Sequence, residues 1–159
     1  VCRDLDIDEP REFWNAIQNR GGRIKLAKAK EGTIQVYDDV DILEELQGGY
    51  RLGVVSNQPQ GSVDEILTLF GLSEYLEFQR GFPDFESIEN RKPDPGHIEE
   101  AMDQLDASSA LFIGDNPEDR KAAERAGITP VYIDRGDYRK VEGVERIESL
   151  YELRHLLDL

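Results

Sequence analysis

The fold is decided by residues 110–119, which read ALFIGDNPED. The run from Ala110 to Gly114 is short and wholly apolar, and turn residues follow it. Such a run suits a strand that is buried on both faces, as in a parallel sheet. Pro117 then suits the first turn of a helix, which we expect to be stopped by Gly127. These residues predict a strand, a turn and a helix, the unit from which α/β proteins are built.

The same alternation extends along the chain in both directions. Further strands are expected at 50–55, 76–80 and 129–133, and helices at 10–31, 39–47, 62–70 and 94–105. We expect Gly21 and Gly22 to break the first helix, and Ser62 with Glu65 to open the third as a capping box. A final helix is expected to carry Ile147, Leu150, Leu153 and Leu157 on one face. The pattern predicts an α/β three-layer sandwich with a parallel, Rossmann-like sheet and right-handed crossovers.

Composition narrows the range of functions. A chain of 159 residues is long enough for one domain with a small appendage. The net charge of -15 argues against binding to nucleic acid or to an anionic membrane, because both need a positive field. The acidic excess, with only six Lys against thirteen Arg, indicates either a salt-loving source or an ordinary acidic protein. With one cysteine, Cys2, and no secretory pattern, we expect a cytoplasmic location.

Three polar groups fall where ligands bind in an open parallel sheet, beyond the carboxyl ends of the strands. Ser56 follows an apolar strand and can offer its hydroxyl to a phosphate oxygen, or it simply ends the strand. Lys92 precedes a helix and supplies a cation, or it is a solvated loop charge. Asp115 and Asp119 can reach one hard cation such as Mg²⁺. Alternatively, Asp115 or Asn116 caps the following helix, whose dipole favours acids in its first turn. Together the three groups are more specific than any one of them.

The order and placement of these groups resemble the haloacid dehalogenase superfamily, over residues 38 to about 134. The resemblance implies that Ser56, assisted by Asn57, binds the phosphoryl group and that Lys92 neutralises charge on phosphate and nucleophile. It also implies that Asp115 and Asp119 hold Mg²⁺. The implied activity is hydrolysis of a small phosphate ester through an aspartyl-phosphate, with a second aspartate as acid and base.

The resemblance also predicts a strand followed by Asp-x-Asp near the N-terminus, lying between the strands that end at Ser56 and Asp115. Asp4 and Asp6 fit this spacing, but only three residues precede them, too few for a central strand. We therefore expect the nucleophile to lie outside this chain. Without that strand, two unpaired sheet edges would face each other. Residues 1–37 are read as the end of a helical cap and residues 38–159 as the α/β core.

Other functions remain open. A 2-haloacid dehalogenase shares the fold but needs no metal, so the acidic pair favours a phosphatase. A relative that lost its nucleophile would act as a binding or scaffold protein. A phosphoacceptor signalling domain also joins acids, a hydroxyl and a lysine, but there the lysine comes last, whereas Lys92 precedes Asp115 here. Neither the substrate nor the oligomeric state can be read from the residues.

Overall fold

The computed structural model describes residues 8–82, 89–136 and 141–159. The strands in these ranges are β1 (Gly53–Pro59), β2 (Phe78–Phe82), β3 (Leu111–Gly114), β4 (Thr129–Ile133) and β5 (Glu145–Ile147). The α-helices are α1 (Pro10–Lys30), α2 (Ile42–Leu46), α3 (Gln60–Leu69), α4 (Gly96–Gln104), α5 (Pro117–Arg125) and α6 (Leu153–Leu156). Short 3₁₀ helices are η2 (Asp38–Asp41), η3 (Leu72–Tyr75) and η5 (Leu150–Glu152). Among these elements, no helix has the length and apolar character needed to cross a membrane.

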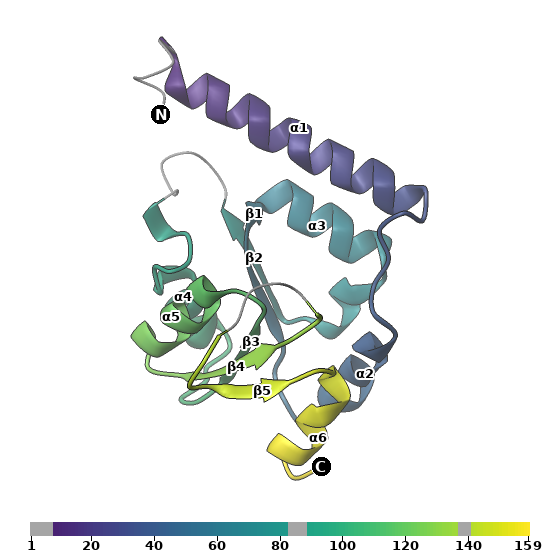
Figure 1. The fold of residues 1–159 in the computed structure, drawn as a ribbon, viewed down its shortest axis with the longest axis vertical. Helices are drawn as coiled ribbons and strands as arrows, with labels where there is room; N and C mark the ends of the chain where they lie inside the picture. Colours follow the sequence, from purple (N-terminus) through teal and green to yellow (C-terminus); the bar gives the residue numbers. More distant parts are fainter. Residues whose placement is uncertain (1–7, 83–88, 137–140) are drawn as a thin grey trace.

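The strands form two parallel sheets (Figure 1). One sheet has the order β1-β2 and the other has the order β3-β4-β5. Within the described residues, β1 pairs only with β2, and β3 pairs only with β4. The predicted α/β fold with parallel strands is therefore confirmed.

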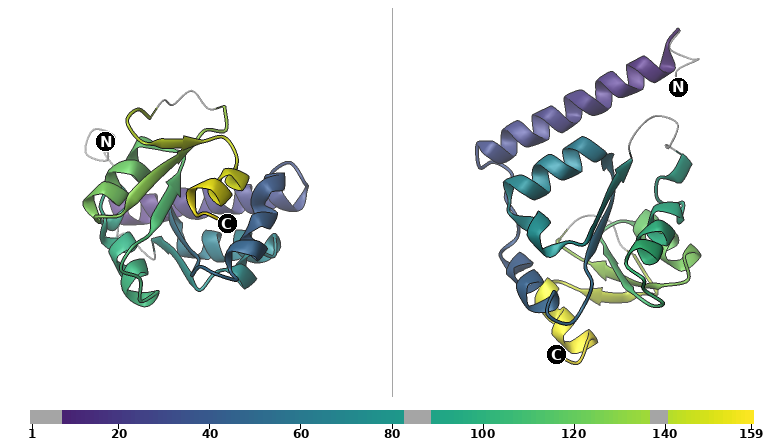
Figure 2. Two further views of the ribbon diagram at one scale, coloured as in Figure 1. Left: turned by 90° about the horizontal axis from the view of Figure 1, so that it is seen from below. Right: turned by 180° about the vertical axis from the view of Figure 1, so that it is seen from behind.

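Helices cover both faces of the sheets (Figures 1 and 2). Helix α3 packs on β1 and β2, and α5 packs on β3 and β4. A second layer forms where α2 and α6 meet β4 and β5, and its buried side chains are Ile42, Leu46, Val131, Ile133, Ile147 and Leu153. A smaller core joins β2 to α4 through Phe78, Ala101 and Leu105. Burying these apolar side chains holds the layers together.

Helix α1 crosses the molecule beyond the carboxyl end of β1 and packs on α3 (Figure 1). It is one continuous helix, so the predicted break at Gly21 and Gly22 is wrong. Gly22 is buried, and a Cβ atom there would collide with the side chain of Ser62 on α3. A glycine costs a helix about 1 kcal/mol relative to alanine. Helices α1 and α3 approach each other so closely at Gly22 that a larger residue would collide with Ser62.

Two other predicted elements are corrected by tertiary pairing. Ile147 does not belong to a terminal helix, because it lies on β5 and pairs with Ile133 of β4. Ser62 lies inside α3, which begins at Gln60, so the predicted capping box does not open this helix. By contrast, the predicted bounds of β4 agree with the structure, and those of β3 and α5 agree to within one residue. Asp4 and Asp6 lie outside the described residues.

A buried carboxylate ties the start of the core to its end. Asp39 of η2 accepts hydrogen bonds of 2.8 Å from the Arg135 guanidinium, the Ser149 hydroxyl and the Leu150 amide. Burial alone would raise the pKa of Asp39, but these hydrogen bonds together hold the pKa below its usual value. The guanidinium of Arg135 also lies 4.1 Å from the ring centre of Tyr37. This Asp39 cluster fixes the segment that joins α1 to the core.

Candidate functional site

Strand β1 changes its pairing where the first candidate side chains lie. Residues Gly53 to Val55 pair regularly with β2, and the register then shifts before Pro59 pairs with Phe82. A bulge of this kind re-aims side chains and is common beside active sites. Ser56 and Asn57 lie within the shifted segment, so the regular pairing ends at Val55, where the strand was predicted to end.

Lys92 lies between the ends of the two sheets. Its Nζ atom donates a hydrogen bond of 2.9 Å to the main-chain carbonyl of Val55 on β1. The same atom lies 2.7 Å from Oδ1 of Asp119, in the first turn of α5 after β3. It also lies 5.1 Å from the ring centre of Phe112 on β3. Lys92 is therefore a buried ion-paired cation that connects the carboxyl ends of β1 and β3.

Asn57 holds the main chain of Lys92. Its Oδ1 accepts from the Lys92 amide at 2.9 Å, and its Nδ2 donates to the Lys92 carbonyl at 3.0 Å. This pair of hydrogen bonds joins the bulge of β1 to the loop before α4. Asn57 thus positions Lys92. This role could not be predicted from the place of Asn57 in the sequence, one residue after Ser56.

Ser56 lies next to the carbonyl that Lys92 contacts. Its hydroxyl oxygen accepts a hydrogen bond of 3.2 Å from the Gln58 amide, and the side chain is half-buried. The hydroxyl still has its own proton to donate. Lys92 thus binds the end of β1 at Val55, the residue directly before Ser56.

The two acidic residues differ in their surroundings. Asp119 is buried, and its Oδ2 accepts from the Asn116 amide at 3.0 Å, so it helps to cap α5. Asp115 is exposed and contacts the side-chain amide of Asn116. A Cβ atom at Gly114 would collide with the Asp119 side chain, so glycine permits this tight turn. The turn after β3 thus contains a helix cap, formed by Asn116 and Asp119, and an exposed carboxylate, that of Asp115.

The residues present suit a magnesium ion. Asp115 offers an exposed hard oxygen donor. The Asp119 carboxylate, four residues on, keeps lone pairs besides those directed at Lys92 and the Asn116 amide. Magnesium commonly takes one or two carboxylates and keeps waters that a phosphate can displace. Within the described part of the chain, no group of three or more acidic, histidine or cysteine side chains gathers as a metal cluster. The acidic pair is therefore a partial ligand set, and the ion's remaining ligands would be water, phosphate or other protein groups.

His97 of α4 is a buried histidine close to these charges. Burial lowers the pKa of its imidazole, and the positive charges of Arg80 and Lys92 lower it further, against the opposing effect of Asp94. The neutral form is therefore favoured near neutral pH. Its burial in α4 makes it part of the packing behind the site.

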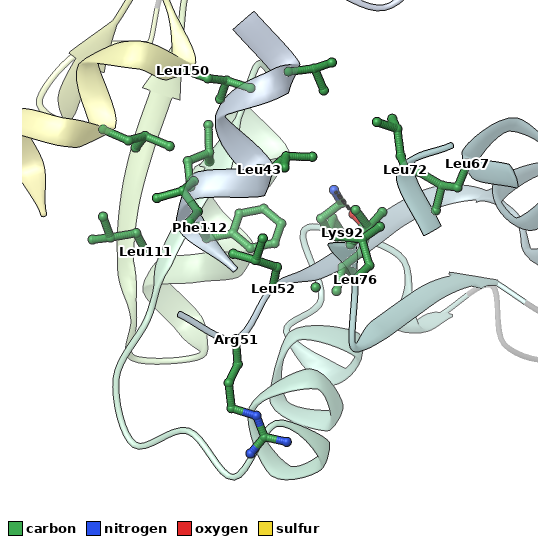
Figure 3. A pocket seen from close by; sticks show the side chains of 17 residues that line it. Leu43, Arg51, Leu52, Leu67, Leu72, Leu76, Lys92, Leu111, Phe112 and Leu150 are labelled. Atoms are coloured by element: carbon green, nitrogen blue, oxygen red, sulfur yellow. Dashed lines mark hydrogen bonds between the residues drawn. The ribbon is translucent and has the colours of Figure 1, made fainter. Parts of the chain in front are cut away.

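A cavity of about 390 Å³ lies between β1 and β3 (Figure 3). Its walls are largely apolar and come from both strand edges and from the helices around them, including Leu43, Leu52, Leu67, Leu76, Leu111, Phe112 and Leu150. Lys92 is the charged side chain among them that joins the two strand ends. The edges of β1 and β3 that have no strand partner in the described ranges therefore face a largely apolar space, which Arg51 and Lys92 also line.

A cation between two parallel strand ends, with a hydroxyl and two carboxylates nearby, defines an α/β protein suited to handling phosphate groups. Comparison with known families agrees with this class. The chain belongs to the haloacid dehalogenase-like hydrolases, whose family model matches residues 9–133.

Relatives and solved structures support the same family. The chain is 38% identical over 80 residues to a phosphoglycolate phosphatase of Cereibacter sphaeroides, covering 50% of this chain and 35% of the relative. It is 31% identical over 146 residues to the pyrophosphatase PpaX of Halalkalibacterium halodurans, covering 89% of this chain and 62% of the relative. A haloacid dehalogenase phosphatase of Thermococcus onnurineus has a similar structure, with a TM-score of 0.68 at 32% identity over 77% of this chain and 58% of that chain. This chain thus spans between about a third and three fifths of these relatives.

Proposed function

We propose that the whole protein is a magnesium-dependent phosphatase that hydrolyses a small phosphate ester. The observation that carries the proposal is the position of Lys92, which is ion-paired to Asp119 and hydrogen-bonded to the end of β1. The names of the phosphoglycolate phosphatase and pyrophosphatase relatives support a phosphate compound as substrate. The acidic surface, with a net charge of -15, favours a cytoplasmic enzyme that acts on small molecules and not on nucleic acid or membranes.

Each site residue has a role in this proposal. The Ser56 hydroxyl donates to a phosphoryl oxygen, and Lys92 offsets the negative charge that gathers as the phosphoryl group transfers. Asn57 keeps Lys92 in place through its two hydrogen bonds to the main chain. Asp115, assisted by Asp119, would hold Mg²⁺, which supplies charge neutralisation and orientation of the phosphate.

The nucleophile in this proposal is an aspartate on a strand that occupies the cavity between β1 and β3. Such a strand would pair with both open edges and satisfy their main-chain groups. Its next residue would then meet Lys92 at the end of the cavity. The aspartate attacks phosphorus, the ester bond breaks, and the leaving oxygen takes a proton from a second aspartate. Water then hydrolyses the aspartyl-phosphate, releasing phosphate.

We further propose that α1 belongs to a cap over the site and that the core begins near Asp38. Support comes from the contacts of α1, which reach α3 and the end of β1 while the Asp39 cluster fixes the segment between. In this arrangement the cap selects the substrate and the core performs the chemistry.

The test is hydrolysis of p-nitrophenyl phosphate by the full-length protein with and without Mg²⁺. Activity should require the metal and should be lost in Asp115→Ala, because an exposed carboxylate of the proposed metal site is removed. The matched control is Glu118→Ala, which removes an exposed acid from the same turn and should leave the rate unchanged. Full magnesium-dependent activity of Asp115→Ala would reject the metal assignment. Turnover of a haloacid but of no phosphate ester would instead identify a dehalogenase.

A further inference from the structure

Arg91 is a positively charged residue that has no role in the hydrolysis proposed above. It precedes Lys92, and its guanidinium lies between two aromatic rings. The guanidinium carbon is 5.6 Å from the ring centre of Trp14 on α1 and 5.2 Å from that of Phe82 at the end of β2. The Nε atom is buried and has no hydrogen-bond partner in the described part of the chain.

Arg91 is half-buried, and it lacks the carboxylate partner that most of the less exposed arginines have. Six arginines form ion pairs with carboxylates, namely Arg51, Arg80, Arg120, Arg135, Arg146 and Arg154. In the described ranges, no carboxylate lies within ion-pair distance of Arg91, although the chain has 34 acidic residues. A partly buried charge without a counter-ion is costly, so an anion placed against it would be stabilised.

The aromatic rings of Trp14 and Phe82 favour the binding of an anion by the Arg91 guanidinium. Stacking between rings holds its plane by cation–π attraction and leaves the in-plane N–H groups as donors. Such an edge binds a carboxylate or a phosphate through two parallel hydrogen bonds. Because Asn57 clamps the main chain of the next residue, the position of Arg91 is fixed relative to Lys92.

Helix α1 makes a second contact with the same edge of the molecule. Lys25 donates a hydrogen bond of 2.9 Å to the side-chain carbonyl of Gln58, which follows Ser56 and Asn57 on β1. Lys25 thus attaches α1 to the end of β1, and Trp14 contacts the end of β2 only through Arg91. Arg91 consequently contacts both α1 and the core.

We propose that Arg91 binds a second anionic group of the substrate, a carboxylate or another phosphate, while Lys92 serves the group that is transferred. This inference rests on the proposed phosphatase function and narrows its substrates to small phosphate compounds with two anionic groups. Arg91 is in this account a specificity residue, and the Trp14 and Phe82 rings hold it in place.

The kinetic test compares probes that differ in the second charge. The full-length enzyme and its Arg91→Gln variant are assayed with phosphoglycolate, with pyrophosphate and with ethyl phosphate, which lacks a second anion. Arg91→Gln should raise KM at least tenfold for phosphoglycolate, for pyrophosphate or for both, with kcat changed less, and should leave ethyl phosphate unaffected. Arg91→Lys keeps the charge but loses the planar guanidinium, so its KM for these probes should lie between those of the wild type and of Arg91→Gln. Equal losses on all three probes, or no loss on any, would show that Arg91 only packs against α1.

A binding measurement separates this inference from the phosphatase proposal. Trp14 is the single tryptophan of the chain, so its fluorescence reports on the Arg91 stack. Titration with glycolate and with inorganic phosphate should change the emission of the wild type for at least one of them, and Arg91→Gln should abolish that change. Identical titrations of both proteins would overturn the proposal, whether or not any ester is hydrolysed. Absence of hydrolysis with a retained Arg91-dependent signal would reject the phosphatase function alone.

Discussion

Two ion pairs in the described part of the chain are largely buried and have nearly equal lengths. Lys92 and Asp119 lie 2.7 Å apart with side chains that are 11% and 9% exposed, and Arg135 and Asp39 lie 2.8 Å apart with side chains that are 15% and 6% exposed. The Asp39 carboxylate receives three hydrogen bonds from packed elements. Lys92 instead lines a largely apolar cavity, and its partner Asp119 lies in the same turn as the exposed Asp115. Burial therefore does not distinguish the Asp39 pair from the Lys92 pair, to which we assign a catalytic role, whereas their surroundings differ.

The largest expected effect comes from breaking the Lys92 pair. Lys92→Met removes the charge that faces the proposed phosphoryl position. Loss of such a stabilising donor lowers kcat by about a hundredfold to a thousandfold. The measurement is steady-state hydrolysis with Mg²⁺, on protein whose folding is checked by circular dichroism. Lys121→Met, at an exposed position of α5, is the matched control, and equal activity of the two variants would contradict the role of Lys92.

Breaking the other pair should affect stability and not catalysis. Asp39→Ala leaves the guanidinium of Arg135, whose side chain is only 15% exposed, without its partner. This loss costs about 3 kcal/mol of unfolding free energy. Urea denaturation measures this loss, and activity per folded molecule should stay at the wild-type level. Asp38→Ala removes an exposed acid from the same 3₁₀ helix and should change stability little. A lower activity per folded molecule of Asp39→Ala would contradict a purely structural role for the Asp39–Arg135 pair.

A smaller effect is expected from the clamp on Lys92. Asn57→Ala removes both hydrogen bonds to the Lys92 main chain but keeps the charge. Misplacement of a catalytic group should lower kcat/KM roughly tenfold. Asn19→Ala, on the exposed surface of α1, is the control. Unchanged kinetics of Asn57→Ala would mean that the loop before α4 positions Lys92 without this clamp.

The smallest effect is a pH dependence that sharpens the contrast. The pKa of Asp39 is held below the usual 3.8 in the folded state, so the unfolded state binds more protons as acid is added. The stabilisation by Asp39 is therefore complete above pH 3.8 and is lost as pH falls through the lowered folded pKa. Unfolding free energies of wild type and Asp39→Asn should converge over this acidic range. A constant difference down to the lowest pH at which the protein folds would contradict this assignment.

A second pH effect concerns His97. Its pKa lies below the usual 6.5, so the unfolded state takes up a proton first as pH falls. Stability should therefore be full above 6.5 and should decline as pH falls toward the lowered pKa of the folded state. His97→Gln should remove this decline in urea denaturation curves between neutral and mildly acidic pH. A decline that persists unchanged would assign it to another group.

Local patterns predicted the second half of the core well. Strands β3 and β4 are short apolar runs bounded by turn residues, and α5 begins at a proline, so each carries its own signal. Strand β5 has only three residues and exists because Ile147 pairs with β4. Its leucine-rich continuation resembled one helix because tertiary pairing is invisible in local periodicity. The break expected at Gly22 was wrong for the same reason.

The site was predictable in its components but not in its contacts. Ser56 and Asp115 could be named because each follows an expected strand, and Lys92 because it precedes an expected helix. The ion pair between Lys92 and Asp119 joins residues 27 positions apart, and no local pattern encodes it. The contact of Arg91 with Trp14 is still more remote. Long-range contacts of this kind depend on how the layers pack.

The most direct test of the central claim is calorimetric titration of inorganic phosphate into the full-length protein, with and without Mg²⁺. If Ser56, Lys92 and the acidic pair form one phosphate site, phosphate should bind with the metal present, and binding should weaken strongly without it or in Asp115→Ala. Phosphate affinity that is the same with and without Mg²⁺, and the same in Asp115→Ala, would contradict a shared metal and phosphate site.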